Sequence, residues 1–387
     1  MKFNKWTVGL AAVGVISLAS AARADEQKMS QVQTALSNTT LSGYVDFAAE
    51  FSPGNTGDLY SYGFAKNQAN GFTLNAVDIA LDKPMDETPW ASGYHVEIEL
   101  GPNIPTGPIR QAYIALRTPI VGTASIDWKV GYFDTIIGYE SNSGPLNPNY
   151  TRSYGYTIEP TGHTGIIGTY KVCDALSITA GVADRTYNFG NTAGFNTGLY
   201  SPTALGSLTL TAPDSWGWFK GASLTAGMVY TGGPRDRNQP PPITHPGTAS
   251  GGANYYVGTT LPTPWAALKF GTAFDYVDEA SSFHNGHNDY VWDVGLYSSY
   301  QVTDKLSINA RGEYYDGQTA GGSATDIIYP NSDGYELTLT VQYNLWANVL
   351  SRAEFRWDHS SHGFPFASPG TPEANSYLLA LNLVYQF

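Results

Sequence analysis

The last thirteen residues of the chain, Asn375 to Phe387, read NSYLLALNLVYQF and end on an aromatic residue. One alternate row of this segment is apolar and has aromatic side chains at both ends: Tyr377, Leu379, Leu381, Leu383, Tyr385 and Phe387. The other row, from Ser376 to Gln386, is mixed and more polar. This period of two is typical of a β-strand that crosses an outer membrane, because one face meets lipid and the other meets the lumen. The alternative is an edge strand of a soluble β-sandwich.

The final residues carry a second signal. A carboxy-terminal strand that ends on Phe resembles the signal by which outer-membrane proteins are handed to their assembly machinery. Tyr385 and Phe387 are therefore candidates for a membrane-assembly signal. The β-barrel assembly machinery is an expected partner, and outer-membrane lipids are another.

The amino-terminal end has the pattern of a secretory signal. Lys2 and Lys5 precede an apolar run from Trp6 to Ala22, and Ala22-Arg23-Ala24 is a small-x-small cleavage site. This pattern predicts a cleaved signal peptide over residues 1–24. No later stretch has the ~20 apolar residues of a transmembrane helix, so a membrane domain would have to close its backbone hydrogen bonds as a barrel.

The domain organisation follows from these two ends. Residues 25–40 are expected to form a short periplasmic segment or a brief helix in the pore, and they are too few for a plug domain. Residues 41–387 are expected to form one barrel domain in the outer membrane of a Gram-negative-type bacterium.

The composition narrows the class of protein. Charged residues make up only 14 % of the chain, aromatic residues make up 13 %, and the formal net charge is −13. An acidic chain of this kind does not offer the basic surface that nucleic-acid binding requires. The single cysteine, Cys173, has no partner for an internal disulfide and no Cys/His cluster beside it, so we expect neither a metal site nor another cofactor.

Short alternating segments separated by turns predict sixteen strands, an even number that leaves both termini on the same side. The expected strands are residues 41–51, 72–82, 93–101, 109–118, 124–134, 163–172, 175–186, 205–212, 220–231, 253–262, 265–276, 289–301, 305–316, 334–344, 349–359 and 375–387. Tight connections such as Val172-Cys173-Asp174 would face the periplasm, and the long connections would face the outside.

The alternation also predicts which side chains point into the lumen. An arginine on the lipid face costs ~2–4 kcal/mol at the midplane, so the charged row of each strand is assigned inward. The pore-lining candidates on the wall are Glu97, Glu99, Arg311, Glu313, Arg352, Glu354 and Arg356. The same rule places Leu339 toward lipid and Thr340 toward the lumen. In strand 109–118, Arg110 and Arg117 fall on opposite faces, so either a charge lies near a rim or the register differs there.

The longest connection is a candidate constriction. A barrel of sixteen strands is too wide for side chains to fill, so an aqueous channel is expected. The connection from Thr135 to Gly162 spans 28 residues after the fifth strand, the position at which trimeric general porins carry their constricting loop. It contains Glu140, Arg152 and Glu159 among several tyrosines, and we expect it to fold into the lumen. The alternative is a surface cap. The similar loop position in trimeric general porins suggests a homotrimer as one assembly, and the sequence leaves the oligomeric state open.

The same region resembles a known family. The quoted motifs are Gly131-Tyr-Phe133-Asp134-Thr135-Ile-Ile-Gly138-Tyr-Glu140, Asn149-Tyr150-Thr-Arg152-Ser153 and Pro160-Thr-Gly-His163-Thr164-Gly165. They are similar to the putative beta-barrel porin-2 (OmpL-like) family, whose layout covers essentially the whole mature chain. The resemblance implies an outer-membrane porin. It supplies no catalytic residues and no substrate.

Three functions remain open at this stage. The favoured one is a porin for passive diffusion of small hydrophilic solutes and ions. The second is an outer-membrane hydrolase, whose candidate bases are His95, His163, His284, His287 and His359, although none lies in a Gly-x-Ser-x-Gly elbow. The third is a structural or adhesive barrel with a closed lumen. Conductance would separate the first function from the other two.

Overall fold

The computed structural model describes residues 32–33, 38–53, 70–101, 108–122, 124–184, 202–231, 252–279, 289–318, 332–364 and 373–387. The expected signal peptide, residues 1–24, lies outside these ranges, as do His284 and His287. Of the expected periplasmic segment, the structure describes Val32–Gln33, which forms the short strand β1, and residues 38–40. Within the described ranges, no helix has the length and apolar character needed to span a membrane.

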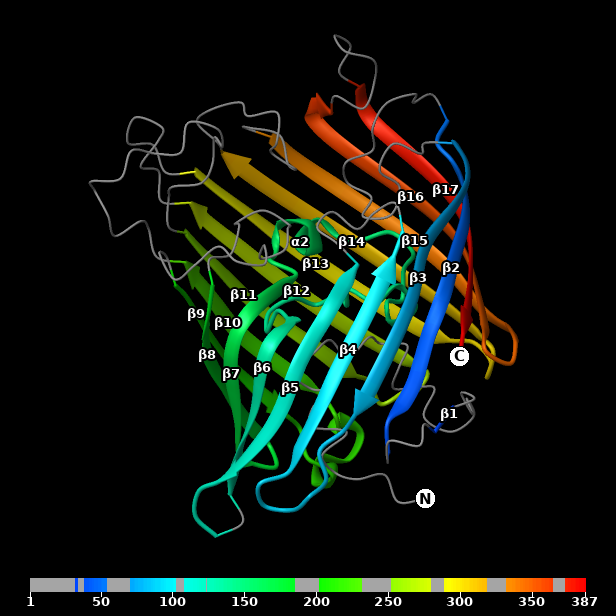
Figure 1. Cartoon of the computed structure of the whole chain (residues 1–387). Coiled ribbons are helices and arrows are strands. Elements are labelled where there is room, and N and C mark those ends of the chain that lie inside the picture. Colours follow the sequence, from blue (N-terminus) through cyan, green and yellow to red (C-terminus); the bar gives the residue numbers. More distant parts are fainter. Residues whose placement is uncertain are drawn as a thin grey trace.

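Sixteen antiparallel strands, β2 to β17, close into a barrel (Figure 1), which confirms the predicted fold class. Their bounds are β2 Thr40–Phe51, β3 Asn70–Lys83, β4 Ser92–Leu100, β5 Ile109–Pro119, β6 Ser125–Asp134, β7 Gly162–Cys173, β8 Leu176–Ala183, β9 Thr203–Thr211, β10 Ser223–Thr231, β11 Gly252–Pro262, β12 Leu268–Glu279, β13 Asp289–Gln301, β14 Leu306–Gln318, β15 Ser332–Trp346, β16 Val349–Phe364 and β17 Glu373–Gln386. Each strand pairs with the next, and β17 pairs with β2.

One end of the barrel carries the start of β2, the carboxy terminus and the short connections, for example 174–175 and 347–348 (Figure 1). One boundary differs from the sequence prediction because of a local turn. Strand β12 begins at Leu268 instead of residue 265, since the Thr263 hydroxyl accepts a hydrogen bond from the Trp265 N–H at 3.2 Å and holds this segment in a turn. The connection between β9 and β10 contains a 3-10 helix, η2 (Asp214–Phe219), that the sequence did not predict.

The two rows of each strand differ in exposure as the alternation predicts. On β17, Leu381 is 65 % exposed on the outer surface, whereas its neighbour Asn382 is 3 % exposed and faces inward. Leu339 and Thr340 of β15 show the same contrast. Apolar side chains therefore cover the outside, where lipid would be, and polar side chains form most of the inner surface.

The seam of the barrel involves the last residue directly. Tyr385 lies opposite Val45 in the ladder between β17 and β2. The Phe387 N–H donates to the Gly43 carbonyl at 3.0 Å, and the Gly43 N–H donates to the Phe387 carbonyl at 3.1 Å. Strand β17 therefore pairs with β2 from Leu379 opposite Phe51 to Phe387 opposite Gly43, and this pairing closes the barrel.

A β-bulge explains the two arginines that did not fit the alternation. In the pairing of β4 with β5, Glu97 lies opposite Gln111 and Ile98 lies opposite Ile109, so Arg110 is an additional residue. A bulge of this kind changes which face the following residues occupy. Both arginines consequently find acidic partners: Arg110 binds Asp134 at 2.5 Å, and Arg117 binds Asp127 at 2.6 Å.

The connection between β6 and β7, residues 135–161, contains η1 (Gly144–Leu146) and α2 (Tyr154–Ile158). Figure 1 shows α2 within the ring of strands. Apolar residues at the start of the connection pack with inward-facing residues of the barrel into a buried cluster: Phe133, Ile136, Ile137, Tyr139, Ile167, Ala183, Leu205, Val229, Tyr256, Ala273 and Tyr297. This cluster fixes the beginning of the connection against the wall formed by β7 to β13.

Candidate functional site

The segment 135–161, called the inner loop below, is shaped by local hydrogen bonds. Ser153 caps α2 by accepting a bond from the Tyr156 N–H at 2.9 Å. The Asn147 side chain accepts from the Ser141 N–H at 2.8 Å and donates to the Ser141 carbonyl at 2.7 Å. Gly138 has φ +108°, a conformation that favours glycine, and an added Cβ there would collide with the Glu159 carboxylate.

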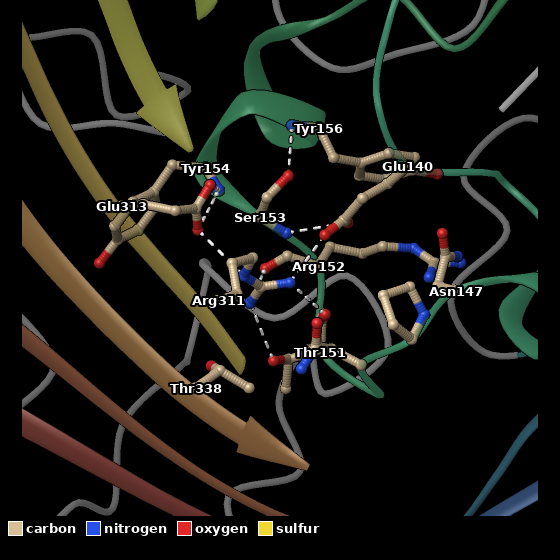
Figure 2. Close-up of polar contacts among 12 residues, drawn as sticks. Glu140, Asn147, Thr151, Arg152, Ser153, Tyr154, Tyr156, Arg311, Glu313 and Thr338 are labelled. Carbon is tan, nitrogen blue, oxygen red and sulfur yellow. Dashed lines mark hydrogen bonds and ion pairs between the residues drawn. The ribbon is translucent and has the colours of Figure 1, made fainter. Parts of the chain in front are cut away.

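Arg311 of β14 is the centre of the contact between the inner loop and the wall (Figure 2). Its guanidinium donates to the Glu140 carboxylate at 2.7 Å and to the Thr151 carbonyl at 2.8 Å. It also donates to the Arg152 carbonyl at 3.1 Å and to Glu336 of β15 at 3.1 Å. A buried guanidinium is tolerated only when its donors are occupied, so this arrangement holds the loop firmly.

The next contact lies beside α2. The Tyr154 N–H donates to Glu313 at 3.0 Å, as Figure 2 shows, and the Tyr154 hydroxyl donates to Asp358 at 2.6 Å. Arg356 donates to the Arg152 carbonyl at 2.5 Å and lies 5.3 Å from the centre of the Tyr154 ring. Strands β14 and β16 therefore both bind the same turn of the inner loop.

Further along, Glu354 of β16 accepts the N–H groups of Tyr150 and Thr151 at 2.5 and 2.8 Å. It also accepts a bond from the Thr340 hydroxyl at 2.6 Å. Arg352 donates to the Asn147 carbonyl at 2.6 Å and to the Pro145 carbonyl at 3.2 Å. The wall thus binds the loop mainly through its backbone groups.

The inner loop also reaches the seam and the opposite side of the barrel. The Tyr150 hydroxyl hydrogen-bonds Glu50 of β2 and accepts a bond from Asn75 of β3 at 3.0 Å. At the other end, Asn254 of β11 donates to the Ile158 carbonyl at 3.1 Å. The loop is therefore attached to strands on both sides of the lumen.

The predicted pore-lining residues fall into two groups. Those on β14 and β16, namely Arg311, Glu313, Arg352, Glu354 and Arg356, are buried against the inner loop and are not free in a water-filled lumen. Glu140 and Arg152 belong to the same contact: the Arg152 guanidinium donates to the Asn142 carbonyl at 2.9 Å and lies over the Tyr156 ring. Their inward direction follows from the alternation, whereas their burial follows from the loop that covers them.

The second group lies on β4, where Glu97 and Glu99 point into the barrel. The Glu99 carboxylate accepts a hydrogen bond from the Tyr44 hydroxyl at 3.0 Å and lies 4.0 Å from Arg110. Glu97 accepts from the Gln111 amide at 2.7 Å and is 3.3 Å from His95. These two carboxylates therefore bind residues of the wall.

Glu97 is part of a chain of polar side chains that runs across the neighbouring strands β3, β4, β5 and β6. We call Asp82, His95, Glu97, Gln111 and Asp134 the polar wall. His95 lies 3.1 Å from Asp82, and the side-chain amide oxygen of Gln111 accepts from the Asp134 N–H at 3.3 Å. The side chains of Asp82, Glu97 and Asp134 are 41 %, 12 % and 32 % exposed, although they lie on the inner surface. Solvent therefore reaches this side of the interior.

Glu159, at the end of the inner loop, lies in a different environment. Its carboxyl group is within hydrogen-bonding reach of Asp275 of β12, and Glu313 of β14 is within reach of Asp293 of β13. We call Glu159, Asp275, Asp293 and Glu313 the carboxyl cluster. Asp275 and Asp293 were not singled out from the sequence. Their signal was the inward row of strands 265–276 and 289–301, which contains Asp275 near the end of the first strand and Asp293 within the second.

Three of the candidate bases, His95, His163 and His359, lie in the described part of the structure. His95 contacts two carboxylates, and His359 lies 3.0 Å from the Asn375 amide oxygen. His163 is fully buried and lies 3.0 Å from the Thr135 hydroxyl, where a substrate would not reach it. Among the described residues, no group of three or more His, Cys, Asp or Glu side chains has the arrangement of a metal site.

A closed barrel with an apolar exterior and a long inner loop defines an outer-membrane porin-like protein. The chain belongs to the family described as "Putative beta-barrel porin-2, OmpL-like", whose model matches residues 38–387. No protein with curated functional information matches it in sequence.

Solved structures share the fold at low sequence identity. The anion-selective porin from Comamonas acidovorans is 11 % identical with a TM-score of 0.60, covering 90 % of this chain and 99 % of its own. The outer membrane channel DcaP of Acinetobacter baumannii is 13 % identical with a TM-score of 0.59, covering 90 % and 97 %. OmpT of Vibrio cholerae, an outer membrane protein described in a trimer form, is 14 % identical with a TM-score of 0.57, covering 90 % and 99 %.

Proposed function

We propose that this protein is an outer-membrane porin through which small hydrophilic solutes and ions diffuse passively. The observation that carries this proposal is the polar wall, whose inward-facing side chains remain partly exposed while the inward-facing charged residues of β14 and β16 are buried against the inner loop. Family membership and the likeness to channels of known structure support the same conclusion.

The path that we propose runs between the inner loop and the polar wall. The loop meets this wall at Asn142, whose amide donates to Asp134 at 3.1 Å. The hydrogen-bond chain from Asp82 to Asp134 offers both donors and acceptors, which can replace the water around a polar solute as it passes. The loop thereby narrows the channel from one side and leaves a polar surface on the other.

The charges along this path favour cations. Asp82, Glu97 and Asp134 are acidic, whereas His95 and Arg110 are each paired with carboxylates. The field of such groups is concentrated in a narrow passage with low-dielectric walls. We therefore infer a modest cation preference, in keeping with the net charge of −13. The anion-selective relative named above is only 11 % identical, so its selectivity is not carried over.

The proposal includes location and assembly. We infer export by the signal peptide over residues 1–24, insertion into the outer membrane by the β-barrel assembly machinery, and a homotrimer like the trimer form described for OmpT. Mass measurement of the detergent-solubilised complex tests the trimer, since a species with the mass of a single mature chain would exclude it.

Planar bilayer recording tests the function. The purified protein should produce discrete conductance steps, and its reversal potential in a salt gradient should show cation preference. Glu97→Gln should lower that preference, because it removes one charge from the polar wall and keeps the shape of the side chain. Asp304→Asn, in an exposed turn, is the matched control and should leave the reversal potential unchanged.

The same recording separates the alternatives. A folded barrel that gives no conductance would favour a structural or adhesive protein with a closed lumen. Hydrolysis of lipid or peptide substrates that is lost on His95→Asn, without loss of folding, would favour the hydrolase. If Glu97→Gln conducts with unchanged selectivity, the porin function stands and the polar wall is rejected as the selective surface.

A further inference from the structure

Two aspartates lie side by side in the barrel wall without donor groups to stabilise their charge. Asp275 of β12 and Asp293 of β13 are directly opposite each other in the ladder. They are 2 % and 1 % exposed. Within the described part of the chain, no N–H or O–H donor reaches any of their four carboxyl oxygens. Buried carboxylates normally have hydrogen-bond donors or a cation beside them, so this arrangement requires an explanation.

Both side chains point at the inner loop. A Cβ added to Gly155 of α2 would lie 2.9 Å from Asp275 Oδ2 and 3.2 Å from Asp293 Oδ2, so the two carboxyl groups pack against this glycine. On either side, Glu159 is within hydrogen-bonding reach of Asp275, and Glu313 is within reach of Asp293. The carboxyl cluster therefore consists of two carboxyl–carboxyl pairs at the contact between α2 and the wall.

Glu313 shows how one of these pairs is polarised. It accepts the Tyr154 N–H at 3.0 Å and lies 3.3 Å from Arg311, so it is placed to be the ionised member of its pair. Asp293, which has no such donor, is then the member that must supply a proton. The same reasoning gives one proton to the pair of Glu159 and Asp275, because two carboxylates in hydrogen-bonding contact cannot both ionise at low cost.

The surroundings do not supply enough positive charge to keep both members of each carboxyl pair ionised. The titratable and charged groups that face the carboxyl cluster come from every element packed against it: Tyr139 and Glu140 of the inner loop, Tyr256 of β11, Tyr297 of β13, Arg311 of β14 and Glu336 of β15. Within this set Arg311 is the cation, and it already binds Glu140 and Glu336.

We propose that the carboxyl cluster is a proton-dependent latch, in which each carboxyl pair shares one proton and thereby holds α2 of the inner loop against β12 and β13. Loss of these protons at alkaline pH places like charges in contact, releases this part of the loop and widens the passage. The inference concerns regulation of the channel and rests on the proposed function.

The direction of the pH effect follows from linkage. Burial, followed by the charge of Asp275, raises the pKa of Glu159 well above its ordinary value. The attached loop therefore binds more protons than the released loop, and the attached state is favoured at lower pH and lost as the pH rises through the raised pKa.

The test replaces the two aspartates by residues that do not titrate. Asp275→Asn and Asp293→Asn, alone and together, keep the shape of each side chain and provide an amide that donates at every pH. The wild-type conductance should rise between neutral and alkaline pH, and the double variant should lose this rise. Because His95 of the polar wall also titrates, the quantity compared is the difference between the wild type and the variant, with Asp304→Asn as the control.

A second measurement follows the inner loop without relying on conductance. A spin label at Thr157→Cys, a half-buried position of α2, is placed in a Cys173→Ser background. Its mobility should increase with pH in the otherwise wild-type protein and remain constant in the double Asn variant. A barrel that never conducts but shows this change would overturn the proposed function and keep the latch.

Three results would overturn the latch. The label mobility could stay constant with pH in the wild-type background. The double Asn variant, shown to be folded by its heat-dependent migration on gels, could retain the full pH response. The mobility could also follow added Ca²⁺ and its chelator instead of pH, which would mean that a cation neutralises the cluster.

Discussion

Single inward-facing charges have two distinct roles in this barrel. Arg311, Arg352 and Arg356 bind carbonyl groups of the inner loop and are buried, whereas Asp82 and Glu97 remain partly exposed. Strand alternation predicted that the arginines point inward, since a charge on the lipid face is costly. It could not predict their partners, because Arg352 and the Asn147 carbonyl that it binds lie about 200 positions apart in the chain.

Arg352→Met tests the holding role. The substitution keeps much of the side-chain volume and leaves the carbonyls of Pro145 and Asn147 without their donor. We expect the folded barrel to lose about 1.5–3 kcal/mol of stability, the range for hydrogen bonds to charged groups. The measurement is the temperature at which the heat-sensitive gel band disappears. Lys305→Met, in an exposed turn, should leave it unchanged; an equal loss in both variants would contradict the role.

Leu339 and Thr340 test the two faces of β15. Leu339→Arg should reduce membrane insertion by ~2–4 kcal/mol if the residue lies near the midplane. The inward face is not an open one, since Thr340 is fully buried and hydrogen-bonds Asn149 at 2.7 Å, so an arginine there would displace the inner loop. Thr340→Val should therefore insert normally and increase the conductance. Similar insertion defects in Leu339→Arg and Thr340→Val, measured by urea titration in lipid vesicles, would show that the register is wrong.

At the scale of elements, the period-two pattern was sufficient to predict the strands but not to predict their irregularities. The final strand could be predicted because aromatic residues mark both ends of its apolar row, and it pairs with β2 as predicted. The bulge at Arg110 was visible only as a conflict between Arg110 and Arg117, since a bulge depends on the neighbouring strand as well as on its own sequence. The helix α2 was missed because five residues are too few for a periodic pattern.

Deletion of Phe387 tests the seam. The deletion removes two backbone hydrogen bonds to Gly43 and the aromatic end of the apolar row. We expect less barrel in the outer-membrane fraction and more unassembled chain in the periplasm. Phe387→Trp keeps both hydrogen bonds and an aromatic end, so it should assemble nearly as well as the wild type. Normal outer-membrane levels of the deletion variant would show that assembly does not depend on the last residue.

At the scale of the whole molecule, the barrel is a wide frame, and we propose that the inner loop determines what can pass through it. Family membership defines the frame, and the contacts of the loop define the side on which a passage remains. The sequence predicted the loop by its length and its position after the fifth strand. The sequence did not predict which wall the loop would leave uncovered. This depends on contacts between the loop and strands far along the chain, such as the contact of Asn254 with Ile158, and no local pattern encodes such contacts.

The central claim is that solutes pass along the polar wall, and cysteine accessibility tests it most directly. In a Cys173→Ser background, Glu97→Cys places a thiol on the polar wall, and Thr338→Cys places one on the inner row of β15 where the residue is fully buried. A charged thiol reagent should reduce the bilayer current of Glu97→Cys and leave that of Thr338→Cys unchanged. A reduced current in Thr338→Cys together with an unaffected Glu97→Cys would contradict the account, because the passage would then lie on the other side of the barrel.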